Sequence, residues 1–304
     1  MKSATAWEAD VPLDASAIRR VVTVAWRLDD ARAEPAGRGM NSQTWLVESG
    51  NARFIAKLVP SDQHDRFVSG LEVSRLVEAS GLPAGAPVET EEGSLWTRVG
   101  DHTLALLTFV DGRPLEGDDP AEQRLIGETL ARVHRILTGR SVPGALQFHW
   151  IDPTVDHLDV EPWLRPTIRS ALEEWERVPP PSLTWGLLHT DPAPEAFLFH
   201  AESASCGLID WDTGLVGPLM YDVASAVMYL GGSEWSTGFV AAYIAEGGLP
   251  REEVERALEP MLRMRWAVQA DYFARRIATN DLTGIAGPHE NTSGLADARR
   301  GLGA

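Results

Sequence analysis

The sequence changes character at DGRPLEGDD, residues 111–119, and this change limits the possible folds more than any other feature. Before it, short runs rich in Val, Ile, Phe and Trp are separated by turns, which is typical of strands. After it, long segments carry apolar residues at helical spacing. The glycine, proline and acids of 111–119 fit neither pattern. The sequence therefore predicts an α+β chain with a sheet-rich N-terminal lobe and a mostly helical C-terminal lobe.

The N-terminal lobe is expected to contain an antiparallel sheet and one helix. The helix covers residues 65–81 and ends at Gly81, directly before Leu82 and Pro83. PAGRGMNS, residues 35–42, is expected to be a flexible glycine-containing stretch. Strands are expected at 44–49, 53–60, 94–99 and 104–110, with the first two forming a hairpin.

The C-terminal lobe is expected to be helical with one short hairpin. The hairpin strands are 196–199 and 206–210, and the tail from residue 284 is expected to be partly loose. Helices are expected at 121–137, 165–178, 234–247 and 251–279.

Composition restricts the partners. The chain has 304 residues, a formal net charge of −17 and one cysteine, Cys206. This charge argues against nucleic acid or an anionic membrane as a partner, and it suits a cationic small molecule, although acidity that only maintains solubility explains it equally well. No run approaches the ~20 apolar residues of a membrane helix. A single cysteine favours the reducing cytoplasm.

Four charged residues fit the needs of phosphoryl transfer from a nucleotide. That reaction uses a lysine on the phosphates, a carboxylate that holds the lysine, a carboxylate on Mg²⁺ and one at the acceptor hydroxyl. Lys57 lies in an apolar strand, and Glu72 follows in the only helix of the small lobe, an order that lets the pair meet. Taken separately, each residue is more simply a solvated surface charge, but an unpaired lysine in an apolar strand is costly.

The other two carboxylates flank the second hairpin. In WGLLHTDPAPEAFLF, residues 185–199, Asp191 is expected to face the acceptor hydroxyl, and His189 to brace the loop with its ring. Asp210 leaves the apolar strand of GLIDWD, where a carboxylate suits a metal ion. The hairpin between Asp191 and Asp210 brings its two ends together, as a shared Mg²⁺-phosphate site requires.

On these segments the chain resembles the aminoglycoside phosphotransferase family, which is similar in fold to choline kinases and, more distantly, to protein kinases. The resemblance covers most of the chain, and its motifs occur in the family's order. They are GRGMNS at 37–42, Lys57 in IAKLV, Glu72, LLTFVDGRPL at 106–115, LARVH at 130–134, HTD at 189–191 and IDWDTGLVGPLMYDVA at 209–224.

The resemblance implies a protein-kinase-like fold of two lobes. Residues 1–109 would form the nucleotide-binding lobe, with a hinge at about 108–113, and 110–304 the lobe with the catalytic loop, metal site and acceptor pocket. ATP or GTP would be the donor and Mg²⁺ the cofactor. The implied nucleotide contacts are Lys57, oriented by Glu72, the loop that includes Ser42, and the backbone of Thr108, Phe109 and Val110; Asp191 would position or deprotonate the acceptor, Asp210 would bind Mg²⁺, and Asp222 would secure the catalytic loop.

Two positions depart from the family pattern. Thr190 replaces the usual glycine, which is tolerable if φ there is not positive. Ala196 stands where the family has an Asn that binds the metal, and alanine cannot bind a cation. Glu195 or water could supply the missing ligand. The other explanation is that the protein has lost catalysis.

Acceptor residues are expected in the segments around 150–175 and 255–290. Their acids and aromatic rings suit a polycationic amino sugar or a nucleoside, although Trp266 and Tyr272 fit a helical core equally well. We therefore expect an O-phosphotransferase acting on a small hydroxylated molecule, first an antibiotic, then a metabolite such as choline or homoserine; a nucleotide-binding pseudokinase regulator is the non-enzymatic alternative. The candidate acceptor contacts are Asp152, Trp163, Trp266, Asp271 and Tyr272.

Overall fold

The computed structural model describes residues 14–38, 42–179 and 182–304, and the chain divides into two compact units. Unit 1 contains Met1–Gly112, Val142–Ala145 and His200–Gly214. Unit 2 contains Arg113–Ser141, Leu146–Phe199 and Leu215–Ala304. The first division falls at Gly112, inside the segment 111–119 where the sequence changes character.

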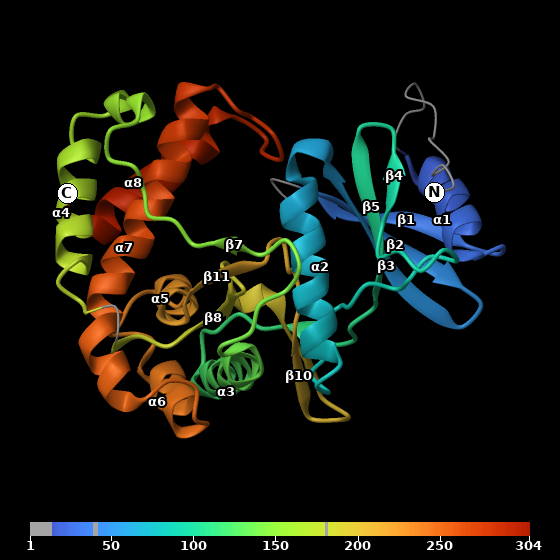
Figure 1. The fold of residues 1–304 in the computed structure, drawn as a ribbon, viewed down its shortest axis with the longest axis horizontal. Coiled ribbons are helices and arrows are strands. Elements are labelled where there is room, and N and C mark those ends of the chain that lie inside the picture. Colours follow the sequence, from blue (N-terminus) through green and yellow to red (C-terminus); the bar gives the residue numbers. More distant parts are fainter. Residues whose placement is uncertain (1–13, 39–41, 180–181) are drawn as a thin grey trace. The chain divides into compact units, whose positions relative to one another are not determined.

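Unit 1 is built on a five-stranded antiparallel sheet, which confirms the expected fold of the N-terminal lobe (Figure 1). In this sheet Lys57 pairs with Thr44 on one side and with Ala105 on the other. The spatial order is β1 (Arg32–Arg38), β2 (Gln43–Ser49), β3 (Ala52–Pro60), β5 (His102–Thr108) and β4 (Thr97–Val99).

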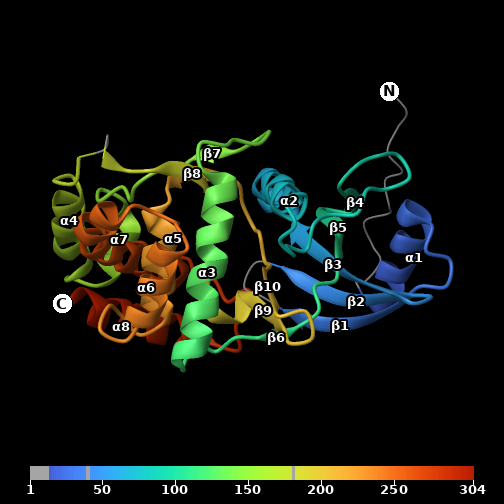
Figure 2. The same ribbon diagram turned by 90° about the horizontal axis from the view of Figure 1, so that it is seen from below.

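Two helices cover opposite faces of this sheet. Helix α1 (Ala15–Trp26) packs on a cluster that includes Leu58, and helix α2 (His64–Glu78) packs on a cluster that includes Val59. Because side chains alternate along a strand, Leu58 and Val59 point to opposite faces. Lys57 therefore points to the same face as Val59, the face covered by α2. Figure 2 shows α1 beside β1 and β2.

Three sequence predictions for unit 1 were wrong in part. Helix α1 was not predicted, although Asp14 caps its first turn by accepting a hydrogen bond from the Ala17 amide at 2.8 Å. The stretch expected to be flexible from residue 35 continues strand β1 as far as Arg38. The strand predicted at 94–99 is regular only over Thr97–Val99.

Unit 2 is mostly helical, as expected. Its long helix α7 packs against α4, α5 and α8, and α3 lies beside α6 (Figure 1). The helices are α3 (Pro120–Leu137), α4 (Leu164–Trp175), α5 (Met220–Tyr229), α6 (Thr237–Ala245), α7 (Arg251–Ala278) and α8 (Pro288–Leu302), with short 3₁₀ turns η2 (Asp156–Val160) and η4 (Pro194–Ala196).

The short strands after residue 112 form two small sheets. Strands β8 (Trp185–Leu188) and β11 (Leu215–Pro218) pair antiparallel, and β11 pairs parallel with β7 (Leu146–Gln147). β6 (Arg113–Pro114) pairs with β9 (Phe197–His200). The strands expected at 196–199 and 206–210 are present as β9 and β10 (Ser205–Leu208).

The C-terminal tail is a helix rather than a partly loose segment. Leu295, Ala298 and Leu302 are buried at helical spacing in α8. Gly294 and Gly301 lie directly against the Phe273 and Trp266 rings of α7, where a Cβ atom would collide. These glycines therefore permit close helix packing. Within the described ranges, no helix combines the length and the apolar character needed to span a bilayer.

Candidate active site

Lys57 occupies the centre of the candidate site in unit 1. Its side chain is buried, with 3% of the residue exposed, and Nζ forms ion pairs with both Asp210 and Asp212. Burial would lower the pKa of the ammonium, but the Asp212 and Asp210 carboxylates outweigh it, and the pKa is raised. Lys57 is therefore a fixed positive charge beside two carboxylates that remain about half exposed.

The expected pair between Lys57 and Glu72 is not formed. Glu72 instead accepts a hydrogen bond from Arg75 at 2.5 Å, one turn later on the same helix. The ammonium is already paired by two aspartates, and Arg75 satisfies the glutamate at the (i, i+3) spacing that favours such pairs. The role of Glu72 in orienting the lysine stays a prediction.

Helix α2 holds the 209–214 segment at very short range. A Cβ atom at Gly70 would stand 2.8 Å from the main-chain nitrogen of Thr213. The Gly214 amide donates to Ser69 Oγ at 2.8 Å. Asp210 itself has a φ of 74°, a conformation that Asp tolerates better than most residues. The fold thus fixes the backbone that presents Asp210 and Asp212.

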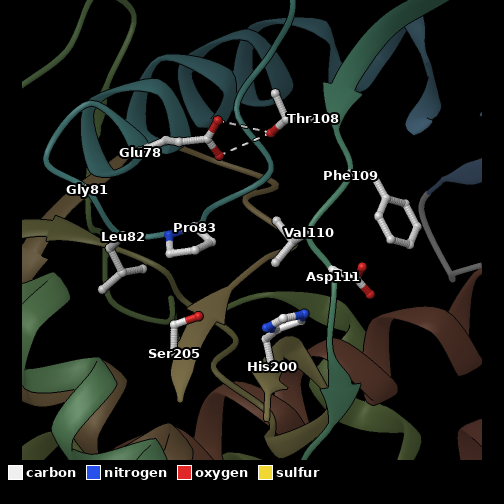
Figure 3. Close-up of a pocket in the computed structure, with 10 residues that line it drawn as sticks. All are labelled: Glu78, Gly81, Leu82, Pro83, Thr108, Phe109, Val110, Asp111, His200 and Ser205. Atoms are coloured by element: carbon white, nitrogen blue, oxygen red, sulfur yellow. Dashed lines mark hydrogen bonds between the residues drawn. The ribbon is translucent and has the colours of Figure 1, made fainter. Parts of the chain in front are cut away.

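A pocket of about 430 Å³ lies against the expected hinge, within unit 1 (Figure 3). The Glu78 carboxylate on its wall is already bound, because it accepts hydrogen bonds from the Thr108 hydroxyl and from the amides of Ala84 and Ala86, each at 3.1 Å. The Thr108 amide donates to Ala86 O at 2.8 Å. The pocket is lined by Glu78, Gly81, Leu82, Pro83, Thr108, Phe109, Val110, Asp111, His200 and Ser205.

Side chains of the hinge segment alternate between two sides. Figure 3 shows Thr108 and Val110 pointing to one side and Phe109 and Asp111 to the other. On the second side, the Arg53 guanidinium carbon lies 4.1 Å from the Phe109 ring centroid and Nη2 lies 2.7 Å from Asp111 Oδ2. Ser42 lies directly before β2, and residues 39–41 of the glycine-containing loop fall outside the described residues. The contacts proposed for the loop and hinge stay predictions.

In unit 2, the loop that leads to Asp191 is tied down by Asp222. This buried carboxylate accepts hydrogen bonds from the amides of His189 at 2.7 Å and Thr190 at 2.8 Å, and His134 Nε2 lies 3.3 Å away. His189 is itself buried, with 1% exposed, and its role in bracing the loop stays a prediction. Asp222 therefore secures the loop before Asp191, and His134 of the LARVH segment supports it from α3.

Thr190 adopts the backbone conformation that the family's glycine would favour. From the sequence, threonine is expected to be tolerable here only if φ is not positive. The observed φ is 77°, so that condition is not met. A positive φ is a strained state for a β-branched residue. The hydrogen bond that its backbone N–H donates to Asp222 Oδ1 holds it there.

Asp191 follows β8 and contacts two residues that the sequence did not single out. Tyr229, the last residue of α5, donates its hydroxyl hydrogen bond to Asp191 Oδ1. Arg265 of α7 lies with Nη2 3.3 Å from the same oxygen. No sequence motif marks either residue, because each depends on helices that meet only in the fold. Asp191 remains open, with 63% of its side chain exposed.

The position of the missing amide ligand is buried and apolar. Ala196 is 7% exposed at the end of η4, and its neighbour Glu195 is exposed. Within the described ranges, no group of three or more His, Cys, Asp or Glu side chains is arranged so that it could hold a metal ion. The carboxylates of Asp210 and Asp212, both in the segment 209–214, converge on a single cation, the Lys57 ammonium.

The acids expected to bind the acceptor have partners within unit 2. Asp271 lies 2.7 Å from His157 Nε2, and Asp152 Oδ1 accepts from the Thr154 amide at 2.8 Å. Trp266 packs on Gly301 of α8, and the Arg299 guanidinium lies 5.6 Å from the Trp163 ring centroid. Tyr272 packs edge-on against Phe273. Their role as acceptor contacts stays a prediction.

Comparison with known proteins places these observations in context. A sequence model described as the phosphotransferase enzyme family matches residues 32–260. A homoserine kinase of Rhizobium johnstonii is 30% identical over 155 residues, which are 49% of this chain and 48% of that protein. The chain thus spans about half the length of this relative.

Solved structures share the fold. An amicoumacin kinase in complex with AMP-PNP and Ca²⁺ has a TM-score of 0.71 at 12% identity, covering 95% of this chain and 93% of its own. Choline kinase from Streptococcus pneumoniae has a TM-score of 0.65 at 14% identity, covering 95% and 98%. At these identities the likeness establishes the protein-kinase-like fold.

Proposed function

Because the chain belongs to the phosphotransferase enzyme family, we propose that it transfers the γ-phosphate of ATP or GTP to a hydroxyl of a small molecule. The observation that carries this proposal is Lys57, a buried strand lysine ion-paired to Asp210 and Asp212. A fixed cation and carboxylates are the groups that phosphoryl transfer requires. The single Cys206 and the proposed use of a nucleotide suit the cytoplasm.

Each proposed residue would have its own role in the reaction. Lys57 would contact the α- and β-phosphates, and the backbone of 108–110 would face the base. Asp191 would accept a hydrogen bond from the acceptor hydroxyl and orient its oxygen toward the γ-phosphorus. Most of the rate would come from positioning and charge neutralisation, without a phosphoenzyme.

We propose Asp210 and Asp212 as the carboxylates for a divalent cation, with Glu195 as the alternative to Asp212. Their oxygens already converge on one positive charge, and Mg²⁺ in phosphotransferases is commonly held by one or two carboxylates, phosphate oxygens and water. When bound, the cation would neutralise charge on the phosphates. The set therefore fits Mg²⁺ even though Ala196 cannot contribute.

Metal titration separates the two candidate ligands. With a non-hydrolysable nucleotide present, Asp212→Asn should weaken Mn²⁺ binding on the order of tenfold, because a charged oxygen ligand becomes a neutral one, whereas Glu195→Gln should not change it. Calorimetry or electron paramagnetic resonance gives this result independently of turnover. Weaker Mn²⁺ binding in Glu195→Gln alone would identify Glu195 as the ligand instead.

Because Asp210 is a proposed ligand in either case, Asp210→Ala should abolish transfer of the phosphate.

The acceptor is proposed from two classes. An antibiotic is the first candidate, supported by the fold shared with an amicoumacin kinase. A small metabolite is the second. It is supported by the relative named homoserine kinase.

A transfer assay tests the proposed function. Labelled ATP and GTP are offered with Mg²⁺ and a panel of aminoglycosides, nucleoside and peptide antibiotics, macrolides, choline and homoserine. We expect one labelled product whose formation slows to a small residual rate in Asp191→Ala and is unchanged in Asp297→Ala, a half-buried aspartate of α8 that pairs with Arg300. Nucleotide binding without any product across the panel would favour the pseudokinase regulator.

A further inference from the structure

The Asp191 carboxylate is held asymmetrically. Both donors that reach it, the Tyr229 hydroxyl and Arg265 Nη2, meet the same oxygen, Oδ1, and Nη2 also lies 3.3 Å from the Tyr229 oxygen. In the part of the chain that the structure describes, no hydrogen bond reaches Oδ2. One oxygen of this carboxylate is thus fixed and the other is available.

Arg265 is itself rigidly placed. Its Nε lies 2.9 Å from Ser225 Oγ, and that hydroxyl donates to Tyr221 O at 2.9 Å. The guanidinium carbon lies 5.8 Å from the ring centroids of both Tyr221 and Tyr229. With 7% of the residue exposed, the guanidinium has one arrangement between α5 and α7.

Both donors keep their protons near neutral pH. Burial raises the pKa of the Tyr229 phenol, and the charge of Asp191 adds to this effect against Arg265. Burial would lower the pKa of Arg265, but the neighbouring tyrosines and Asp191 outweigh it. A buried guanidinium is costly unless it is paired. The hydrogen bond to Ser225 already joins Arg265 to α5, so the further contact with the exposed Asp191 carboxylate calls for an explanation other than the packing of α5 on α7.

We propose that Tyr229 and Arg265 are positioning residues that hold Asp191 by Oδ1 and thereby direct Oδ2 to the acceptor hydroxyl. The proposal rests on the proposed function. As the acceptor oxygen bonds to the γ-phosphorus, the bond from that phosphorus to the β,γ-bridging oxygen breaks and its electron pair leaves with the nucleoside diphosphate. The hydroxyl proton passes to Oδ2 and then to solvent.

Steady-state kinetics test the proposal. The variants are Tyr229→Phe, Arg265→Gln and Arg265→Lys, and each is made both alone and together with Asp191→Ala. Arg265→Gln should lower kcat by on the order of 10²-fold while the KM for nucleotide stays within about twofold, because a misplaced carboxylate affects the reacting geometry and not nucleotide binding. Arg265→Lys should recover part of the loss. Combined with Asp191→Ala, none of the three substitutions should lower kcat further.

A matched control separates positioning from stability. Arg276→Gln removes a second buried arginine of α7, one that binds Asn291 and Asp281. This variant should lower the melting temperature and leave kcat within about twofold. The proposal would be overturned if Arg265→Gln lowered only the melting temperature. It would also be overturned if Arg265→Gln lowered kcat by the same factor in the Asp191→Ala variant as in the parent protein.

Crystal structures provide a test that does not need turnover. Asp191 should occupy one rotamer in the parent protein and several in the Tyr229→Phe, Arg265→Gln double variant. A single unchanged rotamer in the double variant would refute the positioning role. Absence of transfer by the parent protein, with the rotamer result as expected, would instead reject the proposed function and leave the clamp on Asp191 established.

Discussion

At the scale of single residues, Thr190 carries strain that a glycine would relieve. Its φ of 77° costs about 1–2 kcal/mol for a residue with a Cβ atom. Thr190→Gly should therefore raise the free energy of unfolding by up to about 1 kcal/mol, since the greater entropy of glycine in the unfolded chain offsets part of the gain. Urea denaturation of the parent and variant measures the difference.

The control for this prediction is Thr167→Gly, in the helical backbone of α4. Glycine there should lower the free energy of unfolding by roughly 0.5 kcal/mol, because it replaces a residue already in helical geometry. If Thr190→Gly destabilised the protein as the control does, the backbone at 190 would not be strained.

The sequence indicates some residues of the site and not their partners. Lys57 could be predicted because a lysine in an apolar strand needs a countercharge. Its true partners lie more than 150 residues away, and that long-range contact depends on how the 209–214 segment packs on α2. The pair of Glu72 with Arg75 follows from an (i, i+3) spacing that the sequence shows directly.

At the scale of elements, Gly70 controls how closely α2 approaches the aspartate segment. Helix propensity alone predicts that Gly70→Ala stabilises α2 by about 1 kcal/mol. The new Cβ would however stand 2.8 Å from the Thr213 nitrogen, so we expect a loss of about 1–3 kcal/mol and weaker nucleotide binding as Asp210 and Asp212 shift. Thermal unfolding and nucleotide titration measure the two effects.

Arg66→Ala, at an exposed position of the same helix, is the matched control and should leave nucleotide binding unchanged. A Gly70→Ala variant more stable than the parent would show that α2 can retreat from the segment without cost.

Elements with strong apolar periodicity could be predicted from the sequence closely. The helix expected at 251–279 is Arg251–Ala278, and that expected at 121–137 is Pro120–Leu137. Helix α8 was missed because Gly294 and Gly301 resemble loop residues in isolation, and their use as contact points for the rings of α7 exists only after the helices pack. The first division between the units, at Gly112, falls within 111–119, but the composition of that segment does not predict that Val142–Ala145 and His200–Gly214 belong to unit 1, and the hinge stays a prediction.

At the scale of the whole molecule, a net charge of −17 makes stability depend on how carboxylates are bound. Glu122, in the first turn of α3, accepts hydrogen bonds from the amides of Glu116 at 2.7 Å and Gly117 at 2.8 Å and from Arg113 at 2.5 Å. Burial would raise its pKa, but these donors outweigh burial and hold the pKa below its ordinary value of 4.5. The folded state therefore favours the ionised carboxylate.

The sign of the pH dependence follows from this lowered pKa. The stabilisation by Glu122 is complete above about pH 4.5, the ordinary value, and disappears as pH falls through the lower pKa of the folded state. Glu122→Gln should thus lower the free energy of unfolding by about 1–3 kcal/mol at pH 7, with a difference that narrows in acid. Urea denaturation from pH 3 to 7 measures it, with exposed Glu173→Gln as the control that changes little. A difference independent of pH would mean that Glu122 acts through shape alone, and that the loop before α3 is held without its charge.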